Sequence, residues 1–166
     1  LHDALPISQE IKLRGYNPVY EGDDSSIDAV YEELCKVQKP LFFVGGGINL
    51  SDTSELIRKI IAYTGIPVVT SLMGLGCVSD DDPNYFGMIG MHGTYAGNMS
   101  TTETDLLVGL GVRFDDRVTG LLNEFAAKAK IVHFDIDPAE VNKNVRSQIR
   151  VIGNLQWSLG KLFERV

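Results

Sequence analysis

Five short apolar runs, each followed by glycine or polar residues, constrain the fold of this chain more than any other feature. They lie at residues 41–44, 66–70, 106–110, 131–137 and 149–152, and stretches with helical features alternate with most of them. Strands that alternate with helices require right-handed crossovers and form a parallel sheet covered on both faces. With about five to six strands, the sequence predicts an open, doubly wound α/β fold of Rossmann type, in the order 2-1-3-4-5, rather than a barrel.

The helices are expected between these runs. Ser25 and Asp28 form a capping box, and apolar side chains at helical spacing continue it towards Lys39-Pro40, where the helix should end. No clear period is visible over 74–90, which we expect to be a loop with a solvated acidic turn at Asp80–Asp82. The other helices are expected from 51 or 52 to Gly65, and over 94–104, 125–130, 138–144 and 155–166.

Composition limits the class of protein and its partners. A chain of 166 residues suits one globular domain. Its net charge of -7 argues against nucleic acid or an anionic membrane as the main partner, and no apolar run approaches the roughly 20 residues of a membrane helix. Cys35 and Cys77 are isolated, which favours a reduced, intracellular protein without a disulfide framework.

The first residues have the composition of a linker. Prolines and glycines interrupt residues 1–24, the chain opens on leucine, and Leu1–Ser8 lacks the features of a secretory signal. We therefore expect a fragment in which residues 1–24 are a linker or a partly non-native start and residues 25–166 form the domain.

All five predicted strands end in glycine or polar residues. They stand at 45–47, 70–72, 111–113, 135–137 and 153–154, which a parallel sheet places on one edge. Ligands of such sheets bind beyond the carboxyl ends of the strands. Glycines let backbone N–H groups approach a phosphate, an arginine supplies a charged fork, and a carboxylate suits ribose hydroxyls. The pattern predicts a site for a nucleotide-type cofactor.

Each signal also has a structural interpretation. The triplet Gly45–Gly47 is more typical of a tight turn than of a phosphate cradle, and neither it nor Gly109-x-Gly111 fits G-x-G-x-x-G. His92 is as readily a structural histidine, His133 is expected in the core, and the cluster 115–117 is as readily a set of ion pairs. No residues stand at metal-ligand spacing, and no motif identifies a catalytic nucleophile, so no metal or catalytic residue is assigned.

Two longer motifs resemble one family. Residues 86–94 (FGMIGMHGT) and 111–120 (GVRFDDRVTG) are similar to the large catalytic subunit of acetolactate synthase, also called acetohydroxyacid synthase. Residues 43–47, 67–76 and 133–140 support the resemblance, which covers nearly all of residues 9–166.

This resemblance implies a central domain between a pyrimidine-binding and a pyrophosphate-binding domain. The whole enzyme joins two 2-ketoacids, decarboxylating one, for branched-chain amino-acid synthesis. Thiamine diphosphate and Mg²⁺ would bind on the flanking domains, which carry the activating glutamate and the metal ligands, so this chain would be inactive alone. FAD would lie extended across the central domain without net redox work.

The resemblance also implies partners and site residues. The partners would be the flanking domains of the same chain, a second or further copies in a homodimer or homotetramer, and a regulatory subunit, in the bacterial cytoplasm or in a plastid or mitochondrion. Met91, Asp116 and Arg117 would border the substrate channel. The FAD contacts would be Gly46, Gly47, Ser71, Leu72, Met73, Met91, His92, Gly93, Thr94, Gly111, Val112, Arg113, Asp115, Arg117, Val118, Asp135, Ile136 and Asn154.

Some residues depart from the family pattern, and other functions remain open. Ser71 stands for a more usual threonine and Asn154 for an expected aspartate, while Leu1–Ile7 does not match. One alternative is an FAD-free structural domain of another thiamine-diphosphate decarboxylase or carboligase. Another is a stand-alone nucleotide-binding module. The cluster of His92, Arg113 and Arg117 favours the FAD-binding domain.

Overall fold

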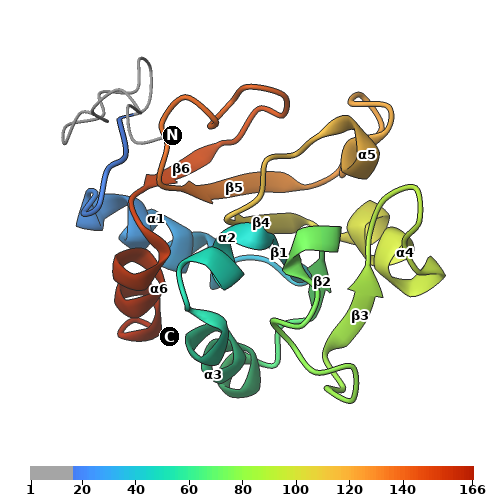
Figure 1. Cartoon of the computed structure of the whole chain (residues 1–166), viewed down its shortest axis with the longest axis horizontal. Helices are drawn as coiled ribbons and strands as arrows, with labels where there is room; N and C mark the ends of the chain where they lie inside the picture. The colour runs from blue at the N-terminus through green and yellow to red at the C-terminus, as the bar shows by residue number, and fades with distance from the viewer. Residues whose placement is uncertain (1–16) are drawn as a thin grey trace, which may run out of the picture.

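A computed structural model describes residues 17–166 as six parallel strands with helices on both faces (Figure 1). The strand order is β3-β2-β1-β4-β5-β6, and every neighbouring pair is parallel. The predicted doubly wound α/β class is confirmed. The predicted order of five strands is also confirmed, with one further strand added at the edge beyond β2. The strands are β1 Pro40–Val44, β2 Val68–Thr70, β3 Tyr85–Met88, β4 Leu106–Leu110, β5 Lys130–Asp135 and β6 Ile149–Ile152.

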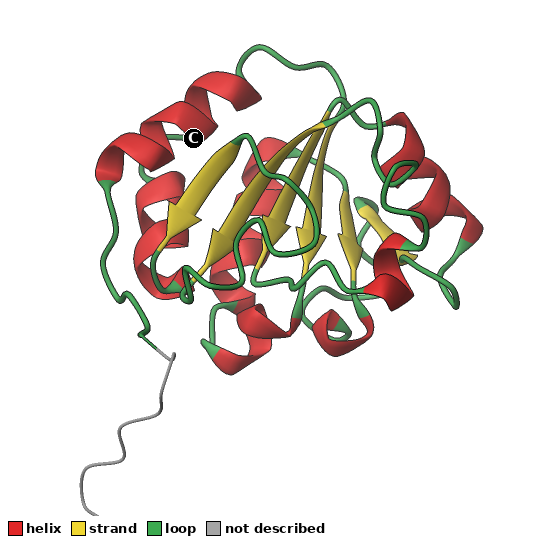
Figure 2. Ribbon diagram, turned by 90° about the horizontal axis from the view of Figure 1, so that it is seen from above, coloured by secondary structure: helices red, strands yellow, loops and turns green. Residues whose placement is uncertain are grey.

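Six α-helices and one 3-10 helix connect these strands. Several begin directly after a strand end, so that the carboxyl edge of the sheet is built from short turns and helix starts (Figure 2). The helices are α1 Asp24–Leu34, α2 Gly46–Leu50, α3 Ser54–Thr64, α4 Tyr95–Glu103, α5 Asp116–Thr119 and α6 Leu155–Phe163, with the 3-10 helix η1 at Leu72–Gly74. None of the helices within residues 17–166 is long and apolar enough to span a membrane.

Alternate residues of β1 face the two sides of the sheet. Phe42 and Val44 pack with the apolar stripes of α1, α3 and α6. Leu41 and Phe43 pack on the other side, where residues of the 112–129 segment complete the core. Figure 1 shows α1, α3 and α6 together on one side and α4 and α5 on the other. Burial of both faces explains why this strand reads as a continuous apolar run rather than an alternating one.

The strand β3 lies within the segment that was predicted to be a loop. It has no fully buried residue, and Gly87 interrupts it with a φ of +92°, so no apolar alternation marks it in the sequence. The following turn covers its outer edge, because Thr94 Oγ1 donates to Phe86 O (2.6 Å) and Thr94 N donates to Met88 O (2.8 Å). These bonds use carbonyls that an open edge strand would leave unpaired.

Two predicted short helices are wrong. Residues 125–129 and 138–144 form turns and bends, and Lys130 already belongs to β5. Each segment contains one residue in the left-handed region, Ala126 with φ +45° and Asn142 with φ +65°. Asn142 Oδ1 accepts from both the amide and the hydroxyl of Ser147 at 2.8 and 2.7 Å, which fixes a turn in place of a helix.

Several predicted boundaries also moved. The first helix is capped by Asp23, whose carboxylate accepts from Ser25 N at 3.0 Å, and it ends at Leu34 rather than near Lys39. The strand β5 ends at Asp135 rather than Asp137. The two shortest helices, α2 and α5, were not predicted; they contain five and four residues, too few for an apolar stripe.

Candidate functional site

Three turns that follow β1, β2 and β4 pack against one another at the carboxyl edge. Gly45 N donates to Leu110 O (3.0 Å) and Gly47 N donates to Gly111 O (3.1 Å), which joins the first turn to the third. A Cβ at Gly47 would lie 2.7 Å from Gly111 Cα, and a Cβ at Gly74 would lie 2.3 Å from Val44 O. The glycine triplet therefore has a structural role, because side chains at these positions would force the three turns apart.

The same turns leave backbone donors without acceptors. Gly46 begins α2, and Leu72 and Met73 begin η1, where N–H groups have no partner within the helix. Among residues 17–166, the amides of these three residues and of Arg113 have no hydrogen-bond acceptor. These four amides are the backbone donors that the glycine turns and the residues after β4 offer to a ligand.

The residues after β4 carry unpaired charges. Arg113, Asp116 and Arg117 are exposed, and none of them forms an ion pair with another part of the described chain. The predicted alternative, a solvated cluster of ion pairs, is therefore not observed within residues 17–166. Asp115 precedes α5, and its Oδ1 is buried without a hydrogen-bond partner there. A buried carboxylate oxygen without a donor calls for a ligand or water.

The turn at residues 90–94 lies against this charged segment. Met91 N donates to Arg117 O at 3.1 Å, and a Cβ at Gly90 would lie 2.5 Å from the same oxygen. The two motifs that carry the family resemblance thus meet in space. Met91 is 78% exposed and His92 is exposed, so both side chains are open to a ligand. The exposure of His92 favours a ligand contact over the alternative, a structural histidine.

Other predicted site residues in this turn have their polar groups engaged. Gly93 N donates to Gly90 O (3.0 Å), and Thr94 caps α4 by accepting from Gly97 N (3.0 Å). A Cβ at Gly93 would lie 2.5 Å from Met88 O, so glycine is needed for the turn itself. These two residues shape the turn, and neither amide is free for a ligand.

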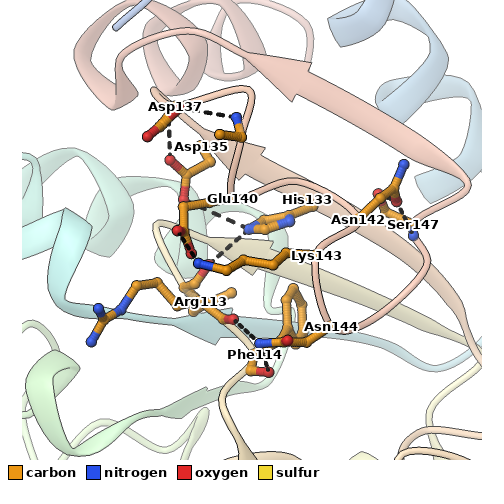
Figure 3. A network of polar contacts seen from close by, with 12 residues as sticks. Arg113, Phe114, His133, Asp135, Asp137, Glu140, Asn142, Lys143, Asn144 and Ser147 are labelled. Carbon is orange, nitrogen blue, oxygen red and sulfur yellow. Dashed lines mark hydrogen bonds and ion pairs between the residues drawn. The ribbon is translucent and has the colours of Figure 1, made fainter. Parts of the chain in front are cut away.

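The end of β5 is partly buried and acidic (Figure 3). Burial raises the pKa of Asp135, although Asp137 N donates to its Oδ1 at 2.9 Å and opposes this shift. The backbone of Ile136 is engaged, since Val19 N donates to its carbonyl at 2.9 Å. His133 is 1% exposed, which confirms its predicted place in the core. Asn154 caps α6 by accepting from Trp157 N at 2.7 Å, so this side-chain oxygen already has a structural task.

Three asparagines whose side chains form hydrogen bonds to the backbone of the site turns were not predicted from the sequence. Asn49 donates to Met73 O (2.9 Å), and Asn144 donates to Phe114 O (3.2 Å). Asn98 brackets Gly90, accepting from its amide at 2.9 Å and donating to its carbonyl at 3.1 Å. Each partner is a backbone group of another element or turn, so no local spacing marks these residues.

Two hollows in the described part of the molecule lie away from the glycine turns. One cavity of about 220 Å³ lies between α4 and the segment after α5, with Asn98, Val118 and Phe125 in its wall. A groove of about 470 Å³ lies at the amino edge, between Pro40, Pro67 and Met99. Within residues 17–166, no group of three or more histidine, cysteine or acidic side chains could hold a metal ion. The candidate site is therefore an open edge and not an enclosed pocket.

Sequence comparison agrees with this architecture. Residues 27–162 match the family described as thiamine pyrophosphate enzyme, central domain. The chain belongs to this family.

Proteins similar to this chain include several acetolactate synthase large subunits. The isozyme 2 large subunit of Escherichia coli is 45% identical over 138 residues, which cover 83% of this chain and 25% of that protein. The large subunit of Haemophilus influenzae is 42% identical over 158 residues, covering 93% and 28% of the two chains. The probable large subunit of Methanocaldococcus jannaschii is 44% identical over 152 residues, covering 92% and 26%. The chain spans about a quarter of the length of the curated relatives it matches.

Proposed function

We propose that this chain is the central domain of an acetolactate synthase large subunit and that its carboxyl edge binds FAD in an extended form. The observation that carries the proposal is the meeting of two motifs: the turn at Met91 is bonded to Arg117, beside the glycine turns. The relatives named above are all acetolactate synthase large subunits, which supports the choice of reaction.

The residues at this edge fit FAD in chemical type. The amides of Gly46, Leu72, Met73 and Arg113 have no acceptor among the described residues and suit phosphate oxygens. The buried Oδ1 of Asp115 needs a donor, and the ribityl and ribose hydroxyls of FAD are donors. The remaining predicted contacts to FAD are Gly47, Ser71, Met91, His92, Gly93, Thr94, Gly111, Val112, Arg117, Val118, Asp135, Ile136 and Asn154.

In the whole enzyme, this domain would line the substrate channel and would not contain the reacting centre. Met91, Asp116 and Arg117 are exposed next to one another in the chain's two bonded motifs, and they would border the substrate channel. Thiamine diphosphate and Mg²⁺ on the flanking domains would supply the decarboxylation and carbon–carbon bond formation, and FAD would do no net redox work. Residues 25–166 would form the domain and residues 1–24 the linker or a partly non-native start.

The proposed partners follow from the same assignment. They are the flanking domains of the full subunit, further copies in a homodimer or homotetramer, and a regulatory subunit. The compartment would be the bacterial cytoplasm, or a plastid or mitochondrion in a eukaryote. Because the activating glutamate and metal ligands would lie outside this chain, the purified chain should make no acetolactate from pyruvate with all cofactors added. Turnover in that assay would overturn the assignment as a central domain.

A titration of FAD with the purified chain tests the ligand. We expect a weak but saturable change in flavin fluorescence, because an extended cofactor would lack the walls of its neighbouring domains. Arg113→Ala and Asp115→Ala should lower the affinity for FAD. Arg150→Ala, which alters an exposed residue on β6, should leave the affinity unchanged. No saturable change at millimolar protein would favour the alternative, an FAD-free structural central domain of another thiamine-diphosphate decarboxylase or carboligase.

A further inference from the structure

The segment Val112–Asp115, here called the arginine loop, rests on a buried histidine of the neighbouring strand. We infer that His133 is a positioning residue that fixes the arginine loop by donating a hydrogen bond from its Nε2 to Val112 O. The two atoms lie 2.7 Å apart. Figure 3 shows the imidazole on β5 and Arg113 on the loop, with the guanidinium directed away from the imidazole.

The partners of the ring determine its protonation. A carbonyl oxygen only accepts, so the hydrogen of the neutral ring must be on Nε2. Within the described residues, Nδ1 is buried and has no hydrogen-bond partner. The charged groups that face the ring are Asp135, with Oδ2 3.8 Å from Nε2, and Glu140. Burial outweighs both carboxylates and the Val112 carbonyl, and lowers the pKa of His133.

A second contact joins the histidine to the same loop. The Phe114 ring stands edge-on to the imidazole, with centroids 4.9 Å apart and planes at 84°. Phe43 and Phe125 also pack edge-on against the Phe114 ring, with ring centroids 5.8 and 6.0 Å from its centroid. Phe114 itself has a φ of +46°, a conformation that a bulky residue rarely adopts. Such a backbone persists only when its surroundings determine it, and His133 supplies two of the contacts that do so.

The loop is also held from its outer side. Asn144 Nδ2 donates to Phe114 O at 3.2 Å, from the turn that follows β5. Val112 and Phe114 are both buried, whereas Arg113 between them is exposed. Fixing the two buried residues therefore fixes the direction in which Arg113 leaves the backbone. It also sets the position of Asp115, the residue that precedes α5.

The test compares His133→Leu, which removes the donor, with His133→Gln, whose amide nitrogen can take the place of Nε2. The Val118 and Thr119 amides donate to Asp115 O, at the end of the arginine loop, at 3.1 and 3.0 Å. We expect His133→Leu to speed hydrogen exchange of these two amides by about tenfold relative to α3, since the buried Val112 carbonyl loses its donor, and His133→Gln to restore protection. Leu159→Ala is the control, because Leu159 is buried on the opposite face. Equal exchange in the two histidine variants, or a loss confined to overall stability, would overturn the inference.

A measurement on the unaltered chain keeps the inference testable if His133→Leu does not fold. Nitrogen-15 NMR of the imidazole at neutral pH should show the hydrogen on Nε2 and a bare Nδ1, and a hydrogen on Nδ1 would overturn the inference. The consequence for ligand binding rests on the proposed function: FAD affinity should fall about tenfold in His133→Leu and persist in His133→Gln. If the unaltered chain binds no FAD, the proposed function fails, while exchange and tautomer still decide the role of His133.

Discussion

Gly109 stands in the middle of β4, where a buried strand ordinarily carries a branched side chain. A Cβ at this position would lie 2.7 Å from Phe114 Cζ and 2.8 Å from Val112 Cγ2. Gly109 is also the register partner of His133 on β5. The glycine therefore makes the space in which the arginine loop folds back over the sheet. In the sequence it was visible only as part of a glycine pair that fits no nucleotide motif.

Gly109→Ala tests this packing at the scale of one residue. The added methyl should lower the free energy of unfolding by about 1–3 kcal/mol, because the loop must shift to admit it. Gly160→Ala is the matched control: nothing lies within 4 Å of a Cβ there, in α6, and alanine favours a helix by about 0.5–1 kcal/mol over glycine. Urea unfolding measures both. A Gly109→Ala protein as stable as the unaltered chain would contradict the packing argument.

The buried histidine also predicts a dependence of stability on pH. The pKa of His133 is lowered from 6.5 in the folded chain, so the unfolded chain binds the proton first as pH falls. The contribution of His133 to the free energy of unfolding is therefore complete above about pH 6.5. It decreases as the pH falls from there to the lower pKa of the folded chain. Asp135 acts in the opposite sense, because its pKa is raised from 3.8 and its contribution is lost as pH rises through the folded pKa.

The measurement is the free energy of unfolding between pH 7 and about 5.5, the range in which an unfolded histidine takes up its proton. The unaltered chain should lose stability over this range, and His133→Gln should lose less, because glutamine does not titrate. Asp135 is present in both proteins, but its Oδ2 lies 3.8 Å from His133 Nε2, so the difference between their slopes reports the histidine together with its interaction with Asp135. Parallel slopes would show that His133 protonates equally in the folded and unfolded chains.

At the scale of elements, apolar runs predicted strands well and the short helices poorly. The central strands β1 and β4 are buried on both faces, and their composition alone marks them. The strand β3 and the turns near Ala126 and Asn142 depend on single residues with positive φ, which local propensity does not show. The same limit applies to the site, since Asn49, Asn98 and Asn144 act on backbone groups of other segments.

The turn between β3 and α4 provides a test at this scale. Asn98→Ala removes both hydrogen bonds to Gly90 and should cost about 1–3 kcal/mol, because it leaves polar backbone groups without their partner. It should also speed exchange of the Met91 amide, which is bonded to Arg117 O. Thr102→Ala, an exposed change on the same helix, is the control. Unchanged stability and unchanged Met91 exchange would show that Asn98 does not hold the turn.

At the scale of the whole molecule, the parallel sheet brings the candidate site together. Residues from 46 to 117 are far apart in the chain, but β1, β2 and β4 all point to one edge. The sequence predicted this convergence because it follows from strand direction alone. It could not predict which backbone amides remain without an acceptor. The amides of Gly93 and Thr94 form backbone hydrogen bonds, whereas those of Gly46, Leu72 and Arg113 have no acceptor among residues 17–166. That distinction depends on the packing of the turns.

The central claim is that the carboxyl edge of this sheet binds FAD. The most direct measurement is NMR mapping of amide shifts as FAD is added to the nitrogen-15-labelled chain. We expect the largest saturable changes to fall on the amides of Gly46, Leu72, Met73 and Arg113, which have no acceptor among residues 17–166, and on His92. Shifts centred instead on the groove of the amino edge, near Lys39 and Met99, or no saturable shifts at all, would contradict it.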